Sequence, residues 1–135
     1  MAIVFAPERQ WYVSNELYPA VVVQSLADAH RALAAGQPVT LVSAPGAGLY
    51  AGCGWWRAVV EAARAAYPEV PCMDILDCAD GSGQALAALR IGVTRLVLWV
   101  DAPGRDAVVA IAEAQGGFVL AAPPSPALGD DNRQR

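Results

Sequence analysis

Four glycines lie close together in the segment Pro45–Gly54, at Gly46, Gly48, Gly52 and Gly54. The segment falls between an apolar run that predicts a strand and a pattern that predicts a helix. Glycine lets a backbone approach a phosphate closely, and the amino end of a helix offers free N–H groups to an anion. Glycine pairs with similar spacings occur in dinucleotide-binding loops. The segment is therefore a candidate anion-binding loop.

Other features of this loop argue against a complete nucleotide site. About eleven residues separate the expected strand from the expected helix, more than a dinucleotide-binding turn requires. The helix would open on the bulky Trp55 and Trp56, where close packing on a sheet needs small residues. No GxxxxGK[ST] pattern is present, so a P-loop is not supported. A flexible lid is the alternative interpretation of the segment.

Polar side chains also follow the apolar runs at other points of the chain. Asp77, Asp80 and Asp101 could converge on Mg²⁺ if the strands before them are neighbours. Asp is equally a preferred helix cap, and each of these residues precedes an expected helix. Asp74 would point to the opposite face from Asp77 and would need a partner of its own. Helix capping is the favoured role of the three acids, and no metal site is predicted.

Cysteine chemistry is a further possibility, because Cys78 follows a strand and precedes a helix, where a thiol pKa can be lowered. Cys53 lies in the glycine-rich loop, and Cys72 begins a strand and is expected in the core. A catalytic cysteine needs a base, and the single histidine, His30, falls in the middle of an expected helix. No CxxC pair suggests a zinc site or a disulfide framework.

The elements that must position these residues alternate along the chain. Apolar runs predict strands at Ala20–Val23, Val39–Ser43, Cys72–Asp77, Leu96–Asp101 and Phe118–Ala121. Helices are expected from Ser25 to about Gly36, over about 55–66, near 84–90, and from Pro103 to the Gly116–Gly117 pair. Strands that are apolar throughout are typical of a parallel sheet covered by helices.

We therefore expect a single α/β domain over residues 1–122, with a βα unit repeated about four times and a closing strand. The first choice is a mostly parallel sheet with helices on both faces, a Rossmann-like three-layer sandwich; a half-barrel of βα units is the alternative. Residues 1–19 form either a β-hairpin or an irregular arm, and residues 123–135 are expected to be a disordered tail. Ala-Pro-Gly occurs after two expected strands, at 44–46 and 102–104, and a strand-to-helix turn explains this better than duplication.

Composition excludes several classes of partner. The 135 residues carry a net charge of -4, with nine scattered arginines and no basic run, which disfavours nucleic acid and anionic membranes. The first residues lack a basic segment followed by a long apolar one, so a cytoplasmic location is expected. Four tryptophans favour a homo-oligomer, with Trp55 and the pair Trp11-Tyr12 as candidate contacts, or a lid that packs on its own domain.

Ligands of open parallel sheets bind beyond the carboxyl ends of the strands. The candidate ligand-binding residues are accordingly Ser43, Gly46, Gly48, Gly52, Gly54, Asp77, Cys78, Asp80, Ser82 and Asp101. The leading hypothesis is binding of a small anionic ligand there, without identified catalysis. The alternatives are a homo-oligomeric interaction module and a nucleotide-binding or hydrolase-like enzyme. The sequence identifies no cofactor.

Overall fold

A computed structural model describes residues 17–124, which form one five-stranded sheet in which every strand pairs in parallel with its neighbour. The strands are β1 (Ala20–Val23), β2 (Val39–Ser43), β3 (Cys72–Asp77), β4 (Arg95–Val97) and β5 (Phe118–Leu120). The helices are α3 (Leu26–Ala34), α4 (Ala47–Tyr50), α5 (Cys53–Ala66), α6 (Ser82–Arg90) and α7 (Arg105–Ala114). The predicted α/β class with a parallel sheet is confirmed.

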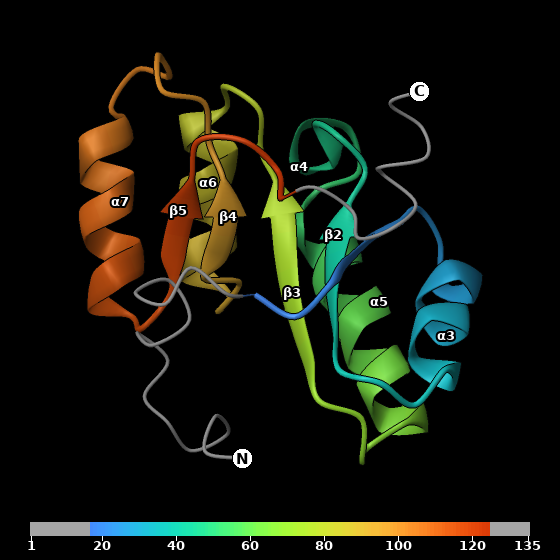
Figure 1. The fold of residues 1–135 in the computed structure, drawn as a ribbon. Helices are drawn as coiled ribbons and strands as arrows, with labels where there is room; N and C mark the ends of the chain where they lie inside the picture. The colour runs from blue at the N-terminus through green and yellow to red at the C-terminus, as the bar shows by residue number, and fades with distance from the viewer. Residues whose placement is uncertain (1–16, 125–135) are drawn as a thin grey trace, which may run out of the picture.

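The strands follow one another across the sheet in chain order, from β1 to β5. Right-handed crossovers that always advance in the same direction place their helices on one face of the sheet. Figure 1 shows this arrangement: the helices α3, α5, α6 and α7 lie behind the sheet. This consecutive order is the one expected of the half-barrel alternative. It lacks the reversal of strand order that creates a binding crevice in Rossmann-like sheets.

The main core lies between the sheet and these helices. Alternate strand residues such as Leu41, Leu76 and Leu96 point into it and meet Leu33 of α3 and Trp56 of α5, and all five side chains are fully buried. Burying an apolar side chain of this size contributes about 1.5–3 kcal/mol, so this layer supplies most of the hydrophobic stabilisation of the described fold.

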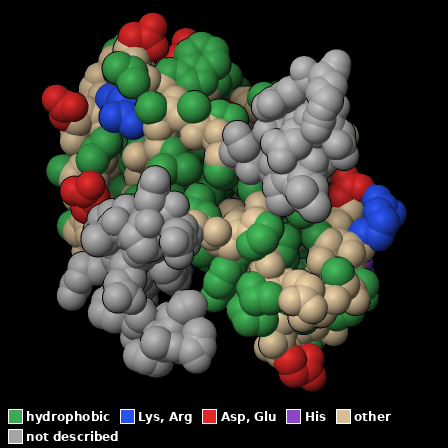
Figure 2. Space-filling model, viewed as in Figure 1, with side chains coloured by type: hydrophobic (Ala, Val, Ile, Leu, Met, Phe, Trp, Pro, Cys, Tyr) green, Lys and Arg blue, Asp and Glu red, His purple; other side chains and the backbone are tan. Residues whose placement is uncertain are grey.

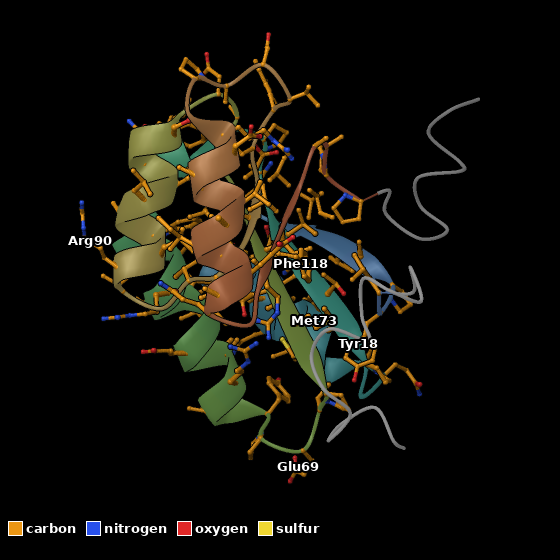
Figure 3. The ribbon with its side chains drawn as sticks, turned by 90° about the vertical axis from the view of Figure 1, so that its left-hand side faces the viewer. Tyr18, Glu69, Met73, Arg90 and Phe118 are labelled. Atoms are coloured by element: carbon orange, nitrogen blue, oxygen red, sulfur yellow. The ribbon has the colours of Figure 1, made fainter. Side chains whose placement is uncertain are left out.

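The opposite face of the sheet carries a second apolar cluster, formed by Ala20, Val42, Met73, Ile75, Val97 and Phe118. Among the described residues, Leu17, Tyr18 and Leu120 pack against it, and none of these residues belongs to a helix. Figure 3 shows Arg90 on the helical side of the sheet and Tyr18 on the other side, and Figure 2 shows hydrophobic side chains in the middle of that face. Of the two predicted helical layers, residues 17–124 therefore supply one.

A buried carboxylate is held between this sheet and its helices. Asp74 of β3 lies 2.8 Å from the guanidinium of Arg64 on α5 and 3.5 Å from that of Arg95 on β4. Arg64 also donates to the carbonyl of Cys72. The predicted need of Asp74 for a partner is confirmed, and the two arginines offset the free-energy cost of burying its charge.

The two Ala-Pro-Gly segments form the same turn, as the sequence predicts. Gly46 has φ 72° and ψ 9°, and Gly104 has φ 74° and ψ 14°. The residue after each glycine donates its N–H to the alanine carbonyl three positions back. These are the angles and the hydrogen bond of a type II turn, whose third position requires positive φ and so favours glycine.

Several predicted boundaries are wrong. The glycine-rich segment contains the short helix α4, and α5 begins at Cys53 instead of Trp55. β4 ends at Val97, so the expected strand up to Asp101 is half as long as predicted, and α7 begins at Arg105 because the positive φ of Gly104 cannot be helical. The predicted cap of α3 is confirmed, since Ser25 accepts a hydrogen bond from the N–H of Asp28.

Two predictions concern residues that the structure does not describe. The hairpin or arm at the amino end falls on residues 1–16, apart from Leu17, Tyr18 and Pro19, and the tail falls on residues 125–135 after Pro124. Within residues 17–124, no helix is long and apolar enough to cross a membrane.

Candidate functional site

The carboxyl ends of β2, β3 and β4 lie side by side at one edge of the sheet, because these strands are neighbours and parallel. The loop with α4, the turn after β3 and the loop from Leu98 to Gly104 therefore form one row, which we call the rim. With no reversal of strand order, the rim is a continuous border without a switch-point crevice. Ten candidate residues were predicted here, and the structure gives them different surroundings.

Ser43 and Asp77 are brought together but are buried and already engaged. The hydroxyl of Ser43 accepts from the N–H of Asp77 at 2.9 Å and donates to the carbonyl of Ala44. The carboxylate of Asp77 accepts from the N–H of Ala79 at 2.9 Å. Ala79 has φ 50°, a conformation that non-glycine residues rarely adopt, and the Asp77 contact supports it. These two polar side chains therefore build the turn after β3.

Cys78 is the next residue and is fully buried in the main core. Gly48 of α4 packs against it so closely that a Cβ on Gly48 would lie 2.8 Å from the sulfur. Burial raises the pKa of the Cys78 thiol to about 12, with smaller contributions from Asp77 and Cys53. Because the thiolate is the nucleophile, the structure does not support Cys78 as a catalytic residue at neutral pH.

Alkylation tests this directly. We expect iodoacetamide to leave Cys78 unmodified in the native protein at pH 7–9, because the thiol is buried and its pKa, raised to about 12, lies well above this range. Cys53, which is half-buried at the start of α5, is the internal comparison. Peptide mass spectrometry after timed labelling gives both rates. Labelling of Cys78 as fast as that of Cys53 would contradict the assigned burial.

The acidic residues of the rim do not gather. Asp80 and Asp101 are exposed, whereas Asp77 is buried against Ala79. Asp101 does not end a strand as predicted, since it lies four residues beyond the end of β4. Among residues 17–124, no three His, Cys, Asp or Glu side chains lie close enough to hold a metal ion. The Mg²⁺ interpretation of these acids therefore has no support in the described part of the chain.

The amino ends of α5 and α6 are the unusual feature of the rim. Their N-cap residues are Gly52 and Gly81; neither helix has a side-chain cap or an acidic residue in its first turn. By contrast, α3 is capped by Ser25 and has Asp28 in its first turn. The two helices are in contact, so two helix starts that lack a capping side chain at the N-cap residue lie on the same border.

Both helices also begin with the same pattern, Gly52-Cys-Gly54 and Gly81-Ser-Gly83. Gly54 and Gly83 are the second helical residues. Among the described glycines, they alone have neither a positive φ nor an atom within 4 Å of the place a Cβ would take. Glycine there costs a helix roughly 0.8–1 kcal/mol relative to alanine without any gain in the fold itself. Gly83 was missed by the sequence analysis, and the repeated Gly-x-Gly was the signal that could have found it.

Apolar side chains flank the start of α6. A methyl of Leu49 occupies the place where a side chain on Gly81 would go, and the N–H of Trp99 donates to the carbonyl of Ala79. Tyr50, the residue after Leu49, and Trp99 are 71% and 47% exposed, which leaves aromatic surface free at the rim. The hydroxyl of Ser82, a predicted ligand-binding residue, is bonded to the carbonyl of Pro103, which links α6 to the next loop.

The chain was compared with known proteins. No model of a protein family matches it, and a search of curated proteins finds no similar sequence.

Proposed function

We propose that this protein binds a small organic anion at the rim, with the anionic group at the amino ends of α5 and α6. The observation that carries the proposal is the paired Gly-x-Gly start of these helices, at Gly52–Gly54 and Gly81–Gly83. A helix start without a Cβ at its second position lets a phosphate or carboxylate reach the backbone N–H groups. Each helix adds a partial positive charge of roughly half an elementary charge at that end.

The remaining parts of the rim support an organic ligand rather than a bare ion. Leu49, Tyr50 and Trp99 offer exposed apolar surface beside the start of α6. Asp80 and Asp101 oppose an anion, but both are exposed. Water and salt screen exposed charges of this kind, and charge-assisted hydrogen bonds to backbone N–H groups are roughly twice as strong as neutral ones.

Titration of the ¹⁵N-labelled full chain with inorganic phosphate and then with phenyl phosphate tests the proposal. We expect saturable shifts of the amide resonances of Cys53, Gly54, Ser82 and Gly83, because their N–H groups meet the anion. The amides of Leu26 and Ala27 in α3 are the internal control, since Ser25 and Asp28 already cap that helix. Equal shifts in both regions, or none at the rim, would refute the site.

Two substitutions sharpen the test. Gly54→Ala and Gly83→Ala together should raise the free energy of unfolding by about 1–2 kcal/mol, because both sites have room for a methyl and ordinary helical geometry. The same change should weaken phosphate binding several-fold by placing a methyl over the N–H groups. Chemical denaturation and the NMR titration measure the two effects. A variant that is stabilised yet binds with unchanged affinity would remove the functional reason for these glycines.

A further inference from the structure

One outer edge of the sheet is exposed and apolar. Among the strands of residues 17–124, β1 is the last on its side of the sheet, and Val21 and Val22 are 37% and 40% exposed. Leu26 at the start of α3 is exposed beside them. Strand edges are normally protected by a charge, a proline or a bulge within the strand, and the sequence Ala-Val-Val-Val has none of these. The edge therefore presents a template for another strand.

The direction of the backbone groups follows from the pairing with β2. The N–H of Thr40 donates to the carbonyl of Pro19, so in a parallel ladder Pro19, Val21 and Val23 face β2. Ala20 and Val22 then direct their N–H and C=O groups outward. The N–H of Gln24, the next outward group, is held by the carboxylate of Asp28 at 2.9 Å. The available edge is therefore short and centred on Val22.

A groove of about 430 Å³ runs along this edge, between β1 and α3, lined by Val21, Val22, Gln24, Asp28, Arg31 and Ala32. It contains one acidic and one basic side chain, which form an ion pair with each other. Such a surface has no net charge and carries both signs, so two copies can meet without net repulsion and the acid of one copy can face the base of the other. A two-fold symmetric interface requires a patch that can meet itself in this way.

We propose that β1 pairs antiparallel with β1 of a second copy of this chain, with the two-fold axis beside Val22. The N–H and C=O of each Val22 then bond to those of its counterpart, and the N–H of Ala20 reaches the carbonyl of Gln24 in the other copy. Asp28 and Arg31 of the two copies face each other across the seam. The result is a continuous ten-stranded sheet with helices on the same side of both halves.

This edge is better suited to self-association than the tryptophan contact predicted from the sequence. Trp55 is half-buried against the main core and lies 5.8 Å, between ring centres, from the buried Trp56. It therefore belongs largely to its own domain. Trp11 and Tyr12 lie outside the described residues. By contrast, no strand of residues 17–124 pairs with the outer side of β1.

Light scattering on the purified full chain and on three variants tests the proposal. We expect a dimer for the native chain and at least a ten-fold higher dimer dissociation constant for Val22→Lys and for Val22→Glu, because like charges then meet at the axis. An equimolar mixture of these two variants should dimerise again. Val100→Lys is the matched control, since Val100 is 72% exposed on the rim and its substitution should leave the dimer intact.

Other results overturn the proposal. A monomeric native chain excludes pairing between copies, as does a dimer that survives Val22→Lys. Failure of the mixed variants to dimerise, with both folded by circular dichroism, shows that Val22 does not meet its own counterpart. Oxidation of a Val22→Cys variant gives an independent measurement, because a symmetric seam predicts a disulfide-linked dimer at that residue and an unrelated interface does not.

Discussion

Trp56→Ala is expected to lower the free energy of unfolding by about 3–5 kcal/mol, the usual cost of removing a buried large aromatic side chain. Trp56 is fully buried on α5 and belongs to the main core, where it packs between the helices and the sheet. A typical domain has only about 5–15 kcal/mol of stability in total. The variant should therefore show a much lower denaturation midpoint, or should fail to fold at room temperature.

Trp56→Phe separates packing from hydrogen bonding at this site. The indole Nε1 of Trp56 is buried and has no hydrogen-bond partner among residues 17–124. Burying this N–H without a partner costs free energy in the native state. Phe lacks the N–H and so avoids that cost, and it retains an aromatic ring. We therefore expect Trp56→Phe to lose clearly less stability than Trp56→Ala, measured by urea denaturation of both variants. Equal losses would mean that the indole N–H does make a bond that stabilises the fold.

Gly117→Ala is expected to destabilise the protein by about 2–4 kcal/mol, more than an ordinary overpacked side chain. A Cβ on Gly117 would lie 2.0 Å from the carbonyl oxygen of Thr94. That oxygen accepts the N–H of Phe118, the first bond between the chain of β4 and that of β5. The backbone can relieve the clash only by moving β5 away from β4.

Denaturation of Gly117→Ala and Gly83→Ala measures the contrast between a crowded and an open glycine. Gly83→Ala should be stabilising, because no atom lies within 4 Å of its Cβ position. Hydrogen exchange should locate the damage of Gly117→Ala at β5, with faster exchange at Phe118 and Leu120 than at Leu41 of β2. A uniform loss of protection throughout the sheet would point to a different cause.

The first three strands were predicted with the bounds that the structure has. β2 and β3 are buried along almost their whole length, so their runs of apolar residues carry a clear signal. The Ser25 cap and the need of Asp74 for a partner were also predicted, because each follows from one residue and its immediate spacing. At these positions, the residue types and their spacing along the chain were sufficient to predict the structure.

The end of β4 shows where such reasoning fails. Residues 96–100 form an unbroken apolar run before Asp101, but the pairing of β4 stops at Val97. Beyond it, the N–H of Trp99 turns to the carbonyl of Ala79, and the N–H of Ala102 closes a turn on Trp99. Val100 is then 72% exposed. Apolar residues at a surface and in a strand look alike in sequence, so the burial of this run could not be predicted.

The structure places the candidate residues along one edge of the sheet, as their positions after the strands predict, but it gives their side chains different surroundings. Ser43, Asp77 and Cys78 were expected to face a ligand, and their side chains are instead buried in the turn that ends β3. Which side chain points inward at a strand end depends on register, and register depends on the strand order that the sequence did not reveal. The backbone of Gly54 and Gly83 is what remains open.

The consecutive arrangement of the strands has a consequence for how this chain acquires its structure. Every strand pairs with the strands nearest to it in the chain, so no step requires a distant segment to be captured. The entropy lost on closing each loop is therefore small, and the contact order is low for a parallel sheet. The consecutive order therefore allows each βα unit to add to the edge formed by the unit before it, with no earlier strand left waiting for a distant partner.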